Sequence, residues 1–216
     1  MLTILGKENS IIQQFIYELR CQSIQKDRLR FRTNLERMGN IFAYEISKTM
    51  AYKAMAVSTP LGNLEMNLPA SNPVLCTILR AGLPLHQGLL NYFDKADNGY
   101  ISAYRNPSKN DDSFEVEVDY ISAPNLNGRD LIISDTMLAT GTSVVKVYRG
   151  LKEFGSANSI HVVAAIASRE GLEYAQDHFP SKTKFWIGAV DEEMTAKSYI
   201  VPGLGDAGDL AFGEKE

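Results

Sequence analysis

The feature that most constrains the fold is a set of short apolar runs without polar alternation. They are rich in Val and Ile and cover Val74–Leu79, 131–134, 160–167 and 185–190. A strand with one wet face alternates apolar and polar residues, whereas a strand covered on both faces of a parallel sheet does not. These runs therefore predict buried parallel strands.

Helical spacing separates the strands. Val144, Val147, Tyr148, Leu151 and Phe154 share one helix face, and Gly155 follows as a C-cap. A strand, a helix and a strand in this order predict an α/β fold, with a parallel sheet flanked by helices.

The first 55 residues are predicted to be a helical N-terminal region. An apolar stripe recurs there at steps of three and four residues, through Leu35, Met38, Phe42, Ile46 and Met50. No repeat or linker divides the chain, so we expect a single domain over residues 1–216.

One segment has a different period. Phe114, Val116, Val118 and Tyr120 alternate with acidic residues, which predicts an antiparallel strand with one packed face. The turn-rich residues before it indicate a β-hairpin arm over 106–120. An ordinary edge hairpin without a functional role fits the same pattern.

Composition excludes several classes of protein. The net charge of -4 argues against nucleic acid as a partner. The longest stretch without Asp, Glu, Lys or Arg has 15 residues and includes Gly, Ser and Asn, so no membrane span is expected. The two cysteines are 55 positions apart, and neither they nor the three histidines form a metal motif. A cytoplasmic protein without a protein-made metal site is the expectation.

The strongest chemical signal lies at residues 135–143, which read DTMLATGTS. A buried strand ends in the carboxylate of Asp135, and a loop of small and hydroxylated residues then opens a helix. Free N–H groups at a helix start bind anions, and Gly141 lets the backbone approach a phosphate closely. A carboxylate beside a phosphate cradle suits a sugar phosphate. The alternative is a plain strand-to-helix turn in which Thr or Ser only caps the helix.

Three further segments fit an anionic substrate. Arg80 follows the strand Val74–Leu79, and Arg105 follows a predicted strand over 100–104. Each guanidinium can grip a diphosphate with paired hydrogen bonds. The segment 199–209, YIVPGLGDAGD, is too rich in Gly and Pro for a regular helix or a central strand, so it is predicted to expose main-chain groups.

The four segments together resemble those of type I phosphoribosyltransferases, in the family's order. Residues 135–143 are similar to the DPMLATGGS of the uracil phosphoribosyltransferases, 78–83 (ILRAGL) to their pyrophosphate loop, and 104–107 (YRNP) to their YRDP segment. Residues 199–209 resemble their uracil-recognition segment.

The resemblance implies a phosphoribosyl transfer from 5-phosphoribosyl 1-diphosphate (PRPP) to uracil, giving UMP and diphosphate. It implies Mg²⁺ bound mainly through PRPP, and a homodimer or higher homo-oligomer. The implied catalytic residues are Arg80, Arg105 and Asp135. PRPP contacts are implied for these three and for Thr136, Met137, Leu138, Ala139, Thr140, Gly141, Thr142, Ser143 and Asp206. Uracil contacts are implied for Ile200, Gly205, Asp206 and Ala207.

The chain departs from the family pattern at five positions, namely Gln87, Asn106, Thr136, Thr142 and Leu210. Several of these changes remove charge near the implied site, so turnover and base choice are open. Two alternatives therefore stand beside a uracil enzyme. One is a phosphoribosyltransferase for another base, and the other is a non-catalytic regulator that binds UMP or PRPP on the same fold.

Overall fold

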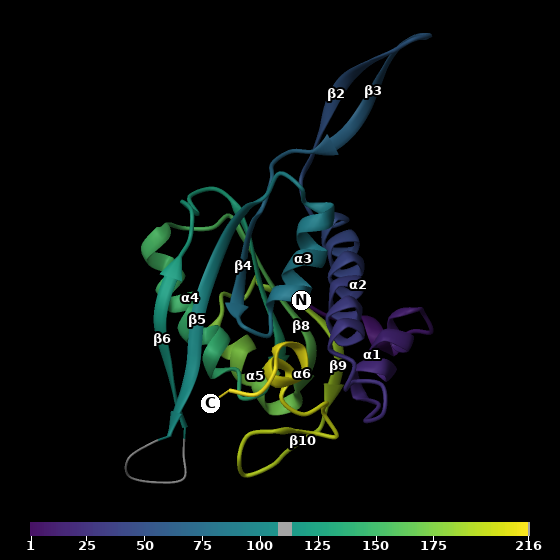
Figure 1. Ribbon diagram of the computed structural model, residues 1–216. Helices are drawn as coiled ribbons and strands as arrows, with labels where there is room; N and C mark the ends of the chain where they lie inside the picture. Colours follow the sequence, from purple (N-terminus) through teal and green to yellow (C-terminus); the bar gives the residue numbers. More distant parts are fainter. Residues whose placement is uncertain (108–113, 216) are drawn as a thin grey trace.

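A seven-stranded mixed sheet forms the centre of the molecule (Figure 1). The computed structural model describes residues 1–107 and 114–215. The strand order is β1 (Leu2–Ile4), β9 (Lys184–Asp191), β8 (Ser159–Ser168), β7 (Asp130–Leu138), β4 (Val74–Leu79), β5 (Asp97–Pro107) and β6 (Phe114–Ser122). Neighbouring strands are parallel from β1 to β5, and only β6 runs antiparallel. The four predicted apolar runs are strands β4, β7, β8 and β9, which confirms the parallel sheet.

Helices cover both faces of the sheet. One face carries α1 (Ile12–Arg20), α2 (Arg28–Ser47), α3 (Leu83–Tyr92) and α6 (Ala207–Phe212), and the other carries α4 (Thr142–Leu151) and α5 (Arg169–His178). Successive residues of β7 enter different cores: Ile132 packs with α2, whereas Leu131 and Ile133 pack with α4. This two-sided burial explains why the strands lack polar alternation.

The helical stripe predicted near the N-terminus lies on α2, except that Met50 follows the end of this helix at Ser47. Leu35, Met38, Phe42 and Ile46 are all fully buried against the sheet. Asp27 caps the helix by accepting a hydrogen bond from the backbone N–H of Arg30, at 3.0 Å. The expectation of helix throughout residues 1–55 differs from the structure at both ends. Residues Leu2–Ile4 are β1, which pairs with β9, and residue 52 already belongs to a strand.

A hairpin that the sequence analysis missed projects away from the body of the protein (Figure 1). It consists of β2 (Tyr52–Thr59) and β3 (Gly62–Pro69), and nearly all of its residues are exposed. A signal was present, because Leu64, Met66 and Leu68 alternate with polar residues. Our prediction extended the helical region to residue 55 and assigned no strand to residues 62–69.

The predicted antiparallel strand at 114–120 is β6, which forms the edge of the main sheet beside β5. Residues 108–113 of the predicted arm lie outside the described residues.

The short elements are η1 (Leu5–Lys7), η2 (Lys152–Phe154), β10 (Glu193–Met194) and β11 (Ile200–Val201). Over the described ranges, no helix combines the length and hydrophobicity that a membrane span requires.

Candidate active site

A cleft of about 680 Å³ opens at the carboxyl ends of β4, β5 and β7, the edge where open α/β sheets bind ligands. All four predicted segments contribute residues that line it, and the YRNP segment does so through Tyr104. The lining comprises Ile78, Leu79, Arg80, Ala81, Ala103, Tyr104, Asp135, Met137, Ala139, Ser143, Lys197, Ser198, Tyr199, Ile200, Gly205, Asp206, Ala207, Gly208 and Lys215. Segments more than 100 residues apart in the sequence thus meet at one site.

The loop between β7 and α4 turns sharply at Gly141. Its φ of 75° lies in the left-handed region, and it is the N-cap residue of α4. A side chain at this position would also collide with the carbonyl oxygen of Gly171 on α5. Glycine is therefore required at 141 for two reasons.

The hydroxyl of Ser168, the last residue of the neighbouring strand β8, holds this loop through a hydrogen bond. Ser168 Oγ donates to the carbonyl oxygen of Ala139 at 2.5 Å and accepts from the N–H of Gly171 at 2.8 Å. Ser168 is the N-cap of α5. A Cβ at Gly171 would collide with the carbonyl oxygen of Ala139, so only glycine fits there. This contact was not predicted from the sequence. The Ser-x-x-Gly spacing indicates only a helix cap and does not indicate the contact with the loop at Ala139.

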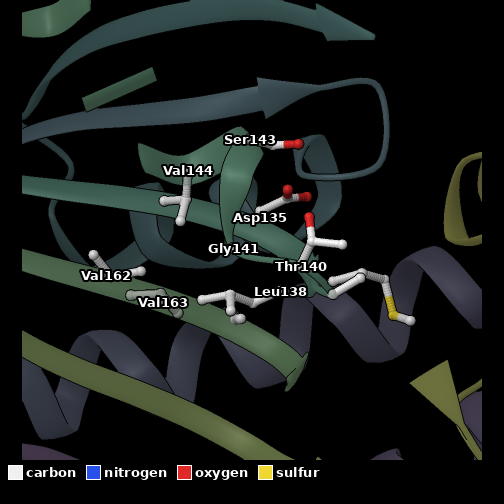
Figure 2. A pocket seen from close by; sticks show the side chains of 11 residues that line it. Asp135, Leu138, Thr140, Gly141, Ser143, Val144, Val162 and Val163 are labelled. Atoms are coloured by element: carbon white, nitrogen blue, oxygen red, sulfur yellow. The ribbon is translucent and has the colours of Figure 1, made fainter. Parts of the chain in front are cut away.

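Polar and apolar side chains separate around the loop (Figure 2). The oxygen-bearing side chains of Asp135, Thr140 and Ser143 gather on one side, whereas Val144 and Val162 lie on the other. The enclosed space beneath the loop measures only about 20 Å³, room for about one water molecule. Of these two spaces around the loop, the open cleft is the one large enough for a substrate.

The expectation that the strand ends at Asp135 is wrong, because β7 continues to Leu138 and includes Thr136. Thr142 is the first residue of α4, and neither threonine lines the cleft. Thr136 is fully buried, and its hydroxyl donates to the carbonyl oxygen of Ala81 at 2.7 Å. Its N–H donates to Asp135 Oδ1 at 2.7 Å and so orients that carboxylate. The hydroxyl of Thr142 lies 2.7 Å from that of Thr140. Both departures from the family pattern thus make hydrogen bonds within the protein.

Arg80 crosses the cleft to the C-terminal segment. Its Nη2 donates to Asp209 Oδ1 at 3.1 Å and to the carbonyl oxygen of Gly213 at 3.2 Å. Its Nε is buried and has no hydrogen-bond partner among the described residues. The peptide bond between Leu79 and Arg80 is cis. Arg80 thus lines the cleft as the cationic partner of Asp209.

Arg105 lies on β5, opposite Val116 of β6. Its side chain is outside what the structure describes, as is that of the neighbouring Asn106. The preceding residue, Tyr104, lines the cleft. The carboxyl end of β5 therefore reaches the site, and the roles of Arg105 and Asn106 stay predictions.

The segment 199–209 forms the far wall. The bond from Val201 to Pro202 is cis, and Gly203 and Gly205 have φ values of 55° and 94°. The expectation that no part of this segment is helical is wrong, because α6 begins at Ala207. Asp206 caps α6 by accepting from the N–H of Asp209 at 3.0 Å, and this cap outweighs the low helix propensity of a following glycine.

Two cations of the cleft were also missed, Lys197 and Lys215. They stand as isolated lysines in the sequence, and only the fold brings them to the site. Two of the departures lie away from it. Gln87 is exposed on α3 and donates to Asn91 Oδ1 at 3.0 Å, and Leu210 lies outside the cleft lining.

Comparison with known proteins agrees with this geometry. The family model described as uracil phosphoribosyltransferase matches residues 7–214. A uracil phosphoribosyltransferase of Porphyromonas gingivalis is 49% identical, over 98% of this chain and 97% of its own length. One from Thermococcus kodakarensis is 37% identical, over 96% and 89% respectively.

A solved structure is also similar throughout. The AQ2163 protein from Aquifex aeolicus superposes with a TM-score of 0.87 at 30% identity, covering 99% of this chain and 98% of that one. Both the family model and the curated relatives span nearly the whole chain. The chain therefore belongs to the uracil phosphoribosyltransferase family.

Proposed function

We propose that this protein transfers the phosphoribosyl group of PRPP to N1 of uracil and releases UMP and diphosphate, a pyrimidine salvage reaction. The observation that carries the proposal is the single cleft that unites the phosphate loop, Arg80 and the 200–208 wall in a chain of this family. Nothing in the comparisons favours another base or a non-catalytic role.

The loop from Ala139 to Ser143 is proposed to bind the 5′-phosphate. The first N–H groups of α4 have no partner within the helix, and the helix dipole favours an anion at this end. Asp135, which lines the same cleft, would accept hydrogen bonds from the ribose hydroxyls. Thr136 would act through its main-chain bond to Asp135, and Thr142 through its bond to Thr140.

Arg80 and Arg105 are proposed to stabilise the departing diphosphate. As the bond from C1′ to the diphosphate breaks, positive charge develops on the ribose and negative charge on the leaving group. Fixed cations that face the leaving group stabilise this separation without reorganising. The buried, unpartnered Nε of Arg80 supports its role. The reaction then depends on positioning and electrostatics, and needs no nucleophile from the protein.

The far wall is proposed to recognise uracil. Uracil presents carbonyl oxygens and an N–H group on one edge, which main-chain groups of Ile200, Gly205 and Ala207 can match. All three residues line the cleft. Asp206 lies between the base and PRPP in this arrangement, with its side chain already held as the cap of α6.

Mg²⁺ is proposed to arrive bound to PRPP. The carboxylates of Asp135 and Asp206 line the cleft, and Mg²⁺ prefers a few carboxylate oxygens together with phosphate oxygens. When bound, the ion would neutralise charge on the diphosphate.

We also propose a homo-oligomer that uses the β2–β3 hairpin. Met55 pairs with Met66 and Val57 with Leu64, so these side chains share one face of the hairpin. Met55, Leu64 and Met66 are exposed by 41%, 46% and 47%. A contiguous exposed apolar face of this kind is typical of a protein interface. Met66→Lys should dissociate the oligomer in light-scattering measurements, while the adjacent Asn67→Lys should not.

A cytoplasmic location is proposed from the cysteines. Cys21 and Cys76 are both free, as expected in a reducing compartment.

The test of the reaction is conversion of labelled uracil to UMP by purified protein with PRPP and Mg²⁺. Cytosine, hypoxanthine and orotate run in parallel. Turnover with uracil alone supports the proposal, and turnover with another base would overturn our interpretation of the 200–208 wall. A protein that binds UMP without turning over any base would instead be a regulator.

A further inference from the structure

The ion pair between Arg20 and Asp191 lies outside the cleft but is bonded directly to the wall proposed to recognise uracil. Arg20 is the last residue of α1, and Asp191 is the last residue of β9. Two parallel hydrogen bonds of 2.8 Å join the guanidinium to the carboxylate. Asp191 is 8% exposed and Arg20 22% exposed, so water has little access to the pair.

Both partners also hold the backbone of Gly203. Asp191 Oδ2 accepts from the N–H of Gly203 at 3.0 Å, and Arg20 Nη1 donates to its carbonyl oxygen at 2.9 Å. The donor and the acceptor of one residue are thus both engaged by one ion pair. Charge-assisted hydrogen bonds of this type are stronger than bonds between neutral groups.

Gly203 is a position where the backbone needs such support. Its φ of 55° is left-handed, and a Cβ there would collide with the carbonyl oxygen of Ile200. The residues that line the cleft lie on either side, with Ile200 before it and Gly205 after it. Gln25 adds a bond from its side-chain amide to the carbonyl oxygen of Leu204, at 3.2 Å. The fold of the wall is therefore fixed from its outer side.

The same contact closes a loop of the chain. After Asp191 the chain leaves the sheet, pairs with itself through β10 and β11, and returns to Gly203. Lys197, Ser198, Tyr199 and Ile200 of this excursion line the cleft. Asp191 therefore joins the start of the excursion to its end, and Arg20 ties that junction to α1.

We propose that Arg20 and Asp191 are positioning residues for base recognition. Neither touches the cleft, and they act by holding Gly203 so that the main-chain groups around it fit uracil. The inference rests on the proposed function of the 200–208 wall. Because recognition through the main chain depends on backbone position, a displacement of about 1 Å is enough to cost about 100-fold in rate or binding. The phosphate loop at 139–143 has no bond to this pair, so PRPP binding is expected to be independent of it.

The test compares Arg20→Lys, Arg20→Gln and Asp191→Asn with the wild-type protein. The Arg20 variants disrupt the hydrogen bond to the carbonyl oxygen of Gly203, and Asp191→Asn removes the negative charge of the ion pair. The KM for uracil is expected to rise by about 10- to 100-fold. The affinity for PRPP, measured by calorimetry without uracil, is expected to change by less than about twofold. Arg20→Lys keeps the charge but cannot bond both Asp191 and Gly203 in the same way, so it is expected to rescue only part of the loss.

Glu192→Gln is the matched control. Glu192 follows Asp191 directly and forms its own bidentate pair with Arg169, at 2.6 and 3.1 Å, but that pair has no bond to Gly203. It is expected to leave the KM for uracil unchanged. Thermal unfolding and PRPP affinity verify the fold of every variant. If Asp191→Asn fails to fold, the partly exposed Arg20→Gln still provides the comparison.

An unchanged KM for uracil in the folded Arg20 variants would overturn the inference, as would an equal loss of PRPP affinity. A wild-type protein that turns over no uracil would overturn the proposed function and this inference with it. If the wild-type protein turns over uracil and the variants have the same KM for uracil, the inference is overturned while the proposed function stands.

Discussion

The hydroxyl of Ser168 donates a hydrogen bond to the carbonyl oxygen of Ala139, and so α5 supports the loop proposed to bind the 5′-phosphate. The same oxygen caps α5 through the N–H of Gly171. One side chain thus links the start of a helix to the position of a substrate loop on the neighbouring strand.

Ser168→Ala is expected to weaken PRPP binding as well as stability. Loss of the cap costs about 1 kcal/mol, and release of the Ala139 carbonyl should raise the KM for PRPP by about fivefold. Steady-state kinetics and thermal unfolding provide the two measurements. Asp27→Ala is the control, because it removes the equivalent cap of α2, which has no bond to residues 139–143. Equal KM values for PRPP in the two variants would show that Ser168 acts only as a cap.

Gly141→Ala is expected to abolish PRPP binding. The substitution puts a Cβ at a φ of 75° and against the carbonyl oxygen of Gly171, so the loop has to move. Gly128→Ala separates the two effects, since Gly128 has a φ of 70° but open space around it. It should lower stability by about 1 kcal/mol and leave PRPP binding intact. Retention of PRPP affinity in Gly141→Ala would contradict the proposed cradle.

Asp135→Asn is expected to lower kcat/KM by about 100-fold or more, because it removes the negative charge that we propose lies next to the ribose while keeping the shape of the side chain. The measurement is UMP formation at saturating uracil. Asp97→Asn provides a control, since Asp97 is an exposed carboxylate whose ion pair with Arg129 is remote from the cleft lining. A fully active Asp135→Asn variant would exclude the proposed role.

Thr142→Gly is expected to change the KM for PRPP by no more than about twofold, because the hydroxyl of Thr142 bonds Thr140 and does not line the cleft. Stability should fall by about 1 kcal/mol, since glycine replaces threonine in the first turn of α4. A large gain in PRPP affinity would show instead that the threonine crowds the phosphate.

A buried histidine makes stability depend on pH. Burial and the charge of Lys184 lower the pKa of His161 to about 4, against the opposing effect of Asp130. Trp186 Nε1 donates to its Nδ1 at 3.1 Å, so Nε2 carries the proton and faces Ser159 Oγ at 3.2 Å. Ser159 in turn donates to Asp130 at 2.6 Å. The folded protein therefore keeps His161 neutral.

Between pH 6.5 and about 4 the unfolded chain binds a proton at this position and the folded protein does not. The free energy of unfolding should thus fall as the pH falls through this range, by up to about 3 kcal/mol at about 1.4 kcal/mol per pKa unit. Chemical denaturation at several pH values measures the slope. His161→Gln should be less stable at neutral pH but show a flatter slope, and an unchanged slope would assign the effect to other groups.

The sequence predicted the central strands because their burial on both faces leaves a continuous apolar run. It predicted the cleft because each proposed functional segment is contiguous, and three of the four lie at the carboxyl end of a parallel strand. It failed at β1, whose three residues have no pattern of their own and are defined by pairing with β9. It also failed at the contacts of Ser168 and Asp191, because their partners lie far away in the sequence or on another element. Alternation in β3 was readable, and our prediction ended the helical region too late.

The bonds of Arg80 have a consequence for how the protein is made. Its partners Asp209 and Gly213 follow it by 129 and 133 residues, whereas the phosphate loop is complete at residue 143. A chain growing on a ribosome therefore carries the phosphate loop long before Arg80 can be held in place. Translation must pass residue 213 before both partners that hold Arg80 in the cleft exist.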